Sequence, residues 1–341
     1  DILIFWEGLP SCGLLMSPLL VSLPNLSIVE TKASVPFDLS NTNLHKKVTY
    51  IDNPDDIYLL KNNFKSKNFI VFTGWKNKAW NKFALEQKKA VNAKIVVVVD
   101  NVLTFSLRQI IGALYFRFIL TRIYDAAFVP GIKSTNLLRF LGMKKNNIYV
   151  GNYGAYEKYF FCDISFSKRK NQFLYVGQFI KRKSLDLLIE AFKSYKSRGG
   201  TWDLCIVGDG NIIVDTTIKG LIVLPFQQPE NVARIMNQSK VFCLLSKKEH
   251  WGTALCEAAA CGMNLLSYYR VGSATDLVRN GINGRVIYKL SVLQIVNAMF
   301  HYQNLSDEIL ANGSKVSIGI ASGYNSRCYE AAFLNMISEI T

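Results

Sequence analysis

Short runs of apolar, largely β-branched residues alternate with longer segments of helical periodicity along the chain. Apolar runs without a polar face are typical of parallel strands that are buried on both sides of a sheet. Strands that alternate with helices predict an α/β architecture built on parallel sheets. The runs lie at 1–5, 68–72, 94–99, 125–129 and 147–150, and then at 173–177, 203–208, 221–224, 241–245 and 264–268.

The length of the chain favours two domains. Its 341 residues exceed the roughly 250 to 300 at which one hydrophobic core stops growing. Between residues 151 and 171 glycines, aromatic residues and a basic cluster replace the periodic pattern. We therefore expect two doubly wound, Rossmann-like domains over 1–160 and 161–323, followed by a helix within 324–341.

Charge adds information about partners. The formal net charge is +15, of which +11 falls in residues 1–170 and +4 in residues 171–341. Such a field favours anionic partners, namely nucleotides, anionic lipids, acidic glycans or nucleic acid. Solubility charge without any partner is an equally good interpretation of the composition alone.

Cysteine and aspartate patterns argue against a metal site. The seven cysteines form no CxxC pair, and Cys205 and Cys243 lie in apolar runs, which indicates a reducing compartment. Asp55 and Asp56 follow Pro54 and are typical of a helix start. We expect no bound metal.

Two apolar segments are candidates for targeting or membrane signals. Residues 14–23 lack a basic flank, which argues against a signal peptide. Residues 105–124 are the most membrane-like part of the chain, but Arg108, Arg117 and Arg122 interrupt them. We expect that this segment cannot span a bilayer.

The segment EHWGTALCE combines two acids with a predicted helix start. Glu249 and Glu257 stand eight positions apart, and a helix is expected to begin at Gly252 or Thr253. A helix N-terminus binds phosphate, whereas carboxylates accept hydrogen bonds from sugar hydroxyls. This arrangement would suit a nucleotide sugar, although Glu near a helix N-terminus is favourable without any ligand.

Four motifs that follow one another in a set order favour the nucleotide-sugar site over a glutamate without a ligand. They are FLYVGQFIKRKSLDLLIEAF, DLCIVGDGN, EHWGTALCEAAACG and RVGSATDLVRNGINGRV, and together they span about residues 173–287. Their order and spacing closely resemble the second domain of the family-four, or group one, retaining glycosyltransferases of the GT-B fold. The resemblance implies two domains facing a central cleft, with the C-terminal helix packing back toward the first domain.

The resemblance also implies residue roles. Glu249 would bind the transferred sugar and Lys183 the diphosphate, and these two are the candidate catalytic residues. Glu257 would bind the nucleotide ribose. The remaining candidates for binding the nucleotide sugar are Gly177, Gln178, Gly208, Phe226, Gly252, Thr253, Ala254 and, in the first domain, Gly13.

The chain departs from the family pattern at three places. Gln178 replaces an Arg and Ser184 replaces a Gly, which weakens leaving-group stabilisation unless Lys181 or Arg182 compensates. The strand at 94–99 ends in Asp100 and Asn101, where many members carry a His. We expect Asp100 and Asn101 on the sugar or acceptor side.

The resemblance implies a retaining, hexosyltransferase-type glycosyltransferase. The donor would be a UDP-, GDP- or other nucleotide sugar, with no cofactor and no metal, and the acceptor a glycan or a lipid-linked saccharide, as in surface polysaccharide assembly. We expect a cytoplasmic location, with peripheral contact of the basic half with an anionic inner membrane face. A nucleotide-sugar epimerase, a non-catalytic partner subunit and a nucleic-acid-binding protein remain alternatives, the last without a supporting motif.

Overall fold

The computed structural model of the chain describes residues 1–7, 14–31, 46–58 and 68–341. These residues form two compact units. The first consists of Asp1–Tyr153 together with Ser326–Thr341, and the second of Gly154–Asn325. The chain therefore passes from one unit to the other after Tyr153 and after Asn325. The sequence predicted these boundaries after residues 160 and 323.

The first unit is built on a parallel sheet with the strand order β3-β2-β1-β4-β5-β6-β7. Its order reverses between β1 and β4, which is the pattern of a doubly wound fold. Two of these strands carry polar residues between their ends, Ser27 and Glu30 in β2 and Thr49 in β3. The strands are β1 (Ile2–Glu7), β2 (Leu26–Thr31), β3 (Val48–Ile51), β4 (Phe69–Thr73), β5 (Lys94–Val98), β6 (Ala126–Val129) and β7 (Ile148–Val150).

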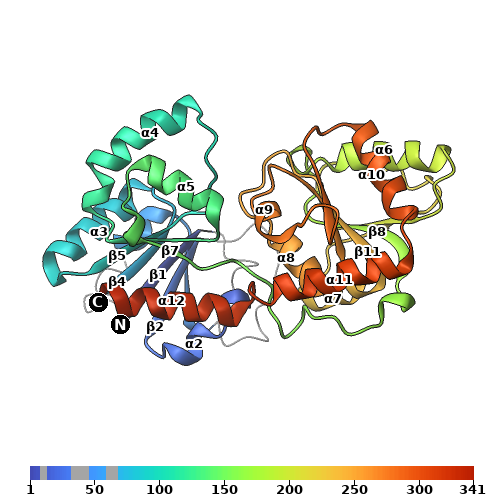
Figure 1. Ribbon diagram of the computed structural model, residues 1–341. Coiled ribbons are helices and arrows are strands. Elements are labelled where there is room, and N and C mark those ends of the chain that lie inside the picture. Colours follow the sequence, from blue (N-terminus) through green and yellow to red (C-terminus); the bar gives the residue numbers. More distant parts are fainter. Residues whose placement is uncertain (8–13, 32–45, 59–67) are drawn as a thin grey trace. The chain divides into compact units, whose positions relative to one another are not determined.

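Helices cover both faces of this sheet (Figure 1). On one face Phe5 lies 5.7 Å from Trp80 and 5.8 Å from Phe83, measured between ring centroids. On the other face Phe128 packs edge-on against Tyr329 and Phe333 of the C-terminal helix. The helices are α2 (Leu19–Ser22), α3 (Lys78–Val91), α4 (Leu107–Phe118), α5 (Ile132–Leu141) and α12 (Ser326–Ile340), with 3-10 turns η2 (Pro54–Tyr58), η4 (Leu120–Arg122) and η5 (Lys145–Asn147).

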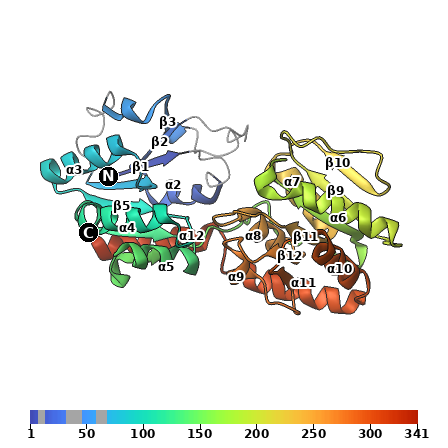
Figure 2. The same ribbon diagram turned by 90° about the horizontal axis from the view of Figure 1, so that it is seen from above.

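The second unit repeats the same plan (Figure 2). Its parallel sheet has the order β10-β9-β8-β11-β12-β13, so that the switch point lies between β8 and β11. Phe173 and Leu204 of neighbouring strands are fully buried. The strands are β8 (Lys170–Val176), β9 (Asp203–Val207), β10 (Leu221–Leu224), β11 (Ser239–Leu244), β12 (Asn264–Tyr268) and β13 (Gly284–Ile287).

Two groups of helices cover the second sheet. The helices α6 and α10 contact each other and contribute Phe192 and Met299 to one core cluster. The helices α7, α8 and α11 contact one another through α8. The helices are α6 (Leu185–Ser197), α7 (Pro229–Gln238), α8 (Thr253–Ala260), α9 (Ala274–Leu277), α10 (Val292–Gln303) and α11 (Asp307–Ala321), with the turns η6 (Phe166–Lys168) and η7 (Lys181–Lys183).

The two segments that connect the units run side by side. The amide of Ala155 donates a hydrogen bond to the carbonyl of Tyr324 at 2.9 Å. A Cβ atom at Gly154 would lie 2.0 Å from the same carbonyl oxygen. Only glycine permits this approach, because real Cβ atoms do not come so close to a backbone oxygen.

Glycines also shape the carboxyl ends of β8 and β9. Gly208 has a φ of +149°, and a Cβ atom there would lie 2.0 Å from the carbonyl oxygen of Gly177. The amide of Gly177 in turn donates to the carbonyl of Val207 at 3.0 Å. The two strand ends are therefore joined by backbone contacts that leave no room for a side chain.

Replacement of Gly208 by Ala tests this close approach. We expect Gly208→Ala to lower the free energy of unfolding by about 2 kcal/mol more than Gly199→Ala, because overpacking adds to backbone strain. Gly199 is the matched control, since its φ is +90° but a Cβ atom there meets nothing within 4 Å. Urea unfolding of both variants measures the difference, and equal losses would show that the loops at Gly208 can move apart.

Candidate functional site

Three polar side chains meet at the switch point of the second sheet. Lys183, in the turn after β8, forms an ion pair with Glu249, which follows β11. The Ser246 hydroxyl donates to Glu249 Oε2 at 3.0 Å. Only 15% of the Lys183 side chain and 13% of the Glu249 side chain are exposed. Ligands of doubly wound folds bind at this position, outside the carboxyl ends of the strands.

Backbone contacts hold the two loops together. The amide of Lys247 donates to the carbonyl of Arg182 at 2.9 Å. The Arg182 guanidinium donates to the carbonyl of Lys248 at 2.8 Å and lies 3.8 Å from Glu249 Oε1. The amide of Gly272 donates to the carbonyl of Glu249 at 3.1 Å. Glu249 is thus fixed at both its backbone and its carboxylate.

The helix α8 begins beside this cluster, at Thr253, as the sequence predicted. Gly252 precedes it with a φ of +94°, and no side chain of the described residues caps the helix. The first backbone amides of a helix have no partner within it, so they point outward with the positive end of the helix dipole. Gly252, Thr253 and Ala254 therefore present amides that suit an anion.

Glu257 lies just past the first turn of α8. It is half-buried, and within the described residues its carboxylate makes no hydrogen bond. Loss of solvation raises its pKa from 4.5 to about 7. A carboxylate in this state gains from any hydroxyl that donates to it, because a hydrogen bond to the charged form offsets the lost water.

The glycines after β8 and β9 lie on the same side of the sheet. Gly177 directly follows β8, Gly208 directly follows β9, and exposed Gln178 comes after Gly177. The hydroxyl of Tyr175 donates to the carbonyl of Gln178 at 2.7 Å. Phe226 is half-buried in the loop between β10 and α7.

Two residues of this site were missed by the sequence analysis. Ser246 bonds to Glu249, and burial raises the pKa of Tyr175, with the Glu249 charge as a second cause. The signal for Ser246 was available, since it is the first polar residue after the apolar strand β11. Tyr175 gave no signal, because it lies inside an apolar run.

The remaining candidates belong to the first unit. Asp100 and Asn101 follow β5, and their side chains share a hydrogen bond of 3.3 Å. Gly13 lies outside the described residues. Within residues 1–7, 14–31, 46–58 and 68–341 no group of three or more His, Cys, Asp or Glu could hold a metal ion.

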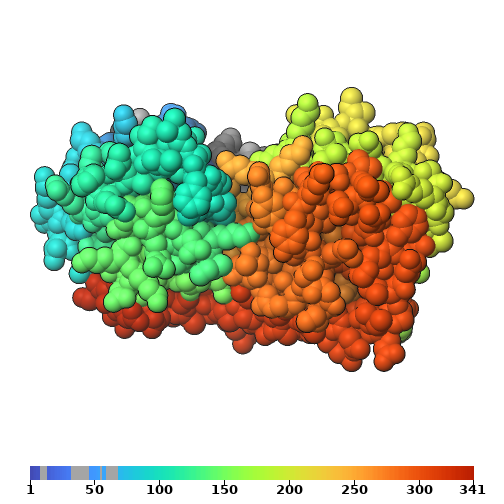
Figure 3. All heavy atoms as spheres, turned by 45° about the horizontal axis from the view of Figure 1, so that its top comes forward, coloured from blue at the N-terminus to red at the C-terminus, as the bar shows by residue number. Residues whose placement is uncertain are grey.

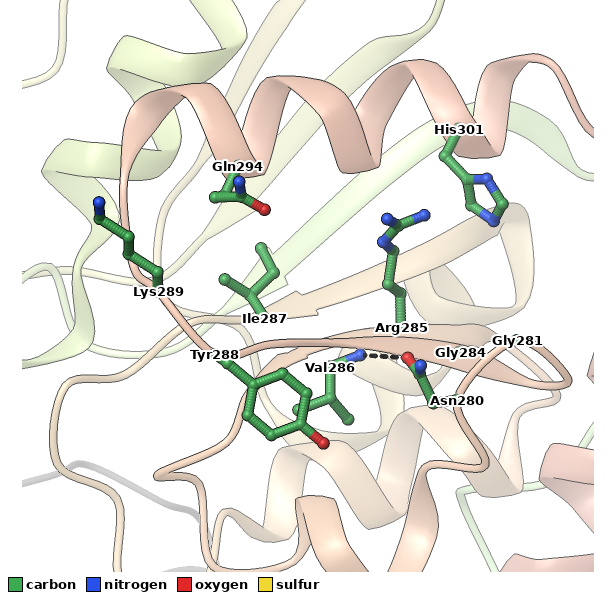
Figure 4. Close-up of a pocket in the computed structure, with 10 residues that line it drawn as sticks. All are labelled: Asn280, Gly281, Gly284, Arg285, Val286, Ile287, Tyr288, Lys289, Gln294 and His301. Atoms are coloured by element: carbon green, nitrogen blue, oxygen red, sulfur yellow. Dashed lines mark hydrogen bonds between the residues drawn. The ribbon is translucent and has the colours of Figure 1, made fainter.

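A surface pocket of about 480 Å³ lies elsewhere in the second unit, between β13 and α10 (Figure 4). Arg285 and His301 lie near one end of it, and the side chain of Asn280 accepts a hydrogen bond of 3.0 Å from the amide of Val286. None of the predicted donor-binding residues lines this pocket. We therefore place the candidate site at β8, β11 and α8.

A family comparison covers this part of the chain. Residues 161–302 match the model of the family described as Glycosyl transferases group 1. Over most of its length the second unit is therefore similar to a group 1 glycosyltransferase domain. The match contains the Lys183–Glu249 pair and α8.

Two curated proteins resemble the chain over part of its length and of theirs. An uncharacterized glycosyltransferase of Methanocaldococcus jannaschii is 27% identical over 123 residues, 34% of this chain and 33% of that protein. The N-acetyl-alpha-D-glucosaminyl L-malate synthase of Bacillus anthracis is 27% identical over 125 residues, 35% of this chain and 32% of that protein. The matched segments thus span about a third of each relative.

A solved structure resembles both units. HepE of Anabaena, in complex with UDP, matches 99% of this chain and 100% of its own with a TM-score of 0.79 at 13% identity. At this identity the likeness concerns the fold. The two parallel α/β units therefore match GT-B glycosyltransferase structures, as the sequence predicted.

The raised pKa of Glu257 predicts a pH-dependent stability. Between pH 4.5 and about 7 the folded protein keeps a proton that the unfolded chain releases, so the free energy of unfolding falls as the pH rises. Glu257→Gln removes this titration. Near pH 4.5 we expect the variant and wild type to have the same free energy of unfolding. Above about pH 7 the free energy of unfolding of the variant should be higher than that of wild type by up to roughly 3 kcal/mol.

Unfolding of both proteins across this pH range measures the effect. Glu190→Gln, on the surface of α6, serves as the control for loss of a carboxylate. A difference between Glu257→Gln and wild type that stays constant with pH would contradict the assignment of a raised pKa.

Proposed function

We propose that this chain is a glycosyltransferase that moves a sugar from a nucleotide diphospho-sugar to an acceptor hydroxyl. The observation that carries the proposal is the ion pair of Lys183 and Glu249 beside the uncapped N-terminus of α8. This combination offers cationic and amide donors to a diphosphate and an acceptor to sugar hydroxyls within one site.

Lys183 is suited to bind the diphosphate without losing Glu249. An ammonium group has three N–H donors, and the ion pair with Glu249 uses one of them. The other two remain for phosphate oxygens, next to the amides of Thr253 and Ala254. Positive charge at this point stabilises the departing phosphate in the transition state.

The two carboxylates would bind hydroxyls on either side of the phosphates. We assign Glu249 to the transferred sugar and Glu257 to the ribose. Neither carboxylate suits a phosphate contact, because like charges repel strongly in a poorly solvated site. Gly177 and Gly208 would allow close approach of the donor, and Phe226 would contact the base.

Arg182 is the better candidate to compensate for Gln178. Gln178 replaces the family's Arg and cannot neutralise charge. The guanidinium of Arg182 lies 3.8 Å from Glu249 Oε1, whereas the side chain of Lys181 is exposed and forms no hydrogen bond or ion pair with the described residues of the cluster. We assign Arg182 to the second cation of the diphosphate site.

We further propose that the reaction retains the anomeric configuration. The bond between the anomeric carbon and the phosphate oxygen breaks, the acceptor oxygen bonds to the same face, and its proton passes to the leaving phosphate. Lys183 and the α8 amides stabilise that phosphate, with no metal in the scheme. Asp100 and Asn101 remain candidates for the sugar or acceptor side.

Neighbouring proteins suggest the donor. HepE has been solved with UDP and with UDP-glucose, and we propose a uridine diphosphate sugar as the first donor to test. We propose a glycan or a lipid-linked saccharide as the acceptor, as in surface polysaccharide assembly. This proposal rests on the family resemblance and on the positive charge of the first 170 residues.

Thermal unfolding in the presence of UDP, GDP and ADP tests donor binding. A nucleotide at 100 times its dissociation constant adds about 2.7 kcal/mol of stability. We expect UDP to raise the melting temperature and Lys183→Ala to weaken its binding by at least about tenfold, because a charge-assisted hydrogen bond is lost. Lys219→Ala, at an exposed lysine of the same unit, is the control. The proposal fails if none of the nucleotides stabilises the wild-type chain.

Glu249→Gln separates turnover from binding. The variant keeps the shape of the side chain but loses the charge that accepts sugar hydroxyls, so we expect turnover of the donor to fall by about a hundredfold with UDP binding retained. Wild-type turnover in Glu249→Gln would remove this residue from the mechanism.

The anomeric configuration of the product tests retention. Proton NMR of the first product formed from an α-linked donor should show the α-anomer. A β-linked product would contradict the proposed mechanism, and conversion of donor without acceptor would identify an epimerase instead.

A further inference from the structure

The outer surface of α4 in the first unit is apolar, against the usual pattern of a surface helix. Exposed fractions reach 73% for Leu107, 61% for Ile111, 59% for Leu114 and 62% for Phe118. These positions follow each other at spacings of four, three and four, so they form one stripe along the helix. We call Leu107, Ile110, Ile111, Leu114, Tyr115 and Phe118 the α4 apolar face.

This face is not needed to attach α4 to its own domain. The opposite side of the helix carries Phe116, which is fully buried and packs against Trp75 and Tyr124. Gly112 lies directly under Trp75, since a Cβ atom there would be 3.0 Å from its ring. The core contact of α4 is complete, and an amphipathic surface helix would then present polar residues outward.

Positive charge borders the apolar face on both sides. At 100° per residue, Arg108 and Arg117 fall at opposite flanks of the stripe, and both are exposed. Residues 101–124 contain no Asp or Glu. Asp125, the next acid, already pairs with Lys88 at 2.7 Å.

Positive charge also predominates in the neighbouring helix α5. Residues 101–156 contain seven Lys and Arg against the single acid Asp125. The helices α4 and α5 contact each other, and Phe105 packs against Phe140. In Figure 3 this blue-green segment forms an outer surface of the first unit. The surface therefore combines an apolar stripe with an excess of cations.

We propose that the α4 apolar face docks the protein onto an anionic membrane surface. A helix of these 12 residues is too short to cross a bilayer, and no helix of the described residues has the length and apolar character to do so. Lying in the interface plane, it buries its apolar face among acyl chains while the arginines meet lipid phosphates. Tyr favours this boundary and Phe is common on the apolar face of interfacial helices, so Tyr115 and Phe118 suit this position.

A second copy of the chain fits this surface less well. A two-fold contact through α4 would bring Arg108 and Arg117 near the same residues of the other copy. Residues 101–124 offer no carboxylate to neutralise them. Lipid phosphates supply the missing negative charge.

The inference goes beyond the proposed transferase activity and does not depend on it. Lys183, Glu249 and α8 belong to the second unit, whereas α4 belongs to the first. Nucleotide binding and vesicle binding can therefore succeed or fail separately.

Vesicle sedimentation with the full chain tests the proposal. We expect binding to vesicles of equal parts phosphatidylcholine and phosphatidylglycerol, weak binding to pure phosphatidylcholine, and loss of binding as salt rises. Ile111→Ser combined with Leu114→Ser should reduce the partition coefficient by at least about tenfold. Arg108→Gln combined with Arg117→Gln should weaken binding and flatten its salt dependence.

Controls separate docking from folding and self-association. Val21→Ser combined with Ile213→Ser removes two apolar side chains that are 86% and 97% exposed on other elements, and should bind like wild type. The α4 variants should show the same cooperative unfolding in urea as wild type. Wild-type chain that stays in the supernatant with anionic vesicles overturns the proposal. So does an α4 double variant that binds normally, or a dimer in solution that this variant abolishes.

Discussion

The ion pair between Lys183 and Glu249 joins the two loops at the switch point of the second sheet. Both side chains are largely buried, so the removal of either one would leave a charge without compensation in a poorly solvated place. The positions of Arg182, Ser246 and the start of α8 all depend on the same two loops. In the proposed donor site these groups are therefore in place before any ligand binds.

Most of the fold could be predicted because buried parallel strands are continuous apolar runs. The prediction failed for β2, β3 and β13, which it did not contain. Tyr50 of β3 is 59% exposed, so an edge strand of this kind lacks the apolar signal. β13 (Gly284–Ile287) contains a glycine and Arg285, so it also lacks a continuous apolar run.

The candidate site could be predicted where spacing along the chain determines geometry. Thr253 begins a helix, and Lys183 and Glu249 follow the two central strands of their sheet. Their direct contact could not be predicted, because 66 positions separate them and only the fold brings them together. The raised pKa of Glu257 likewise depends on the atoms packed around it, which no local pattern specifies.

The segment around α4 illustrates how burial resolves an ambiguous pattern. From sequence, its apolar residues fit a core helix as well as a membrane contact, since both need the same composition. The structure separates the two, because Phe116 is buried in the core while Ile111 and Leu114 remain exposed. One side of α4 packs on its own domain and the opposite side is an exposed apolar stripe, so charged residues fit only on the flanks between them. Arg108 and Arg117 lie on those flanks. An exposed apolar stripe of this kind is unfavourable in water and is typical of an interaction surface.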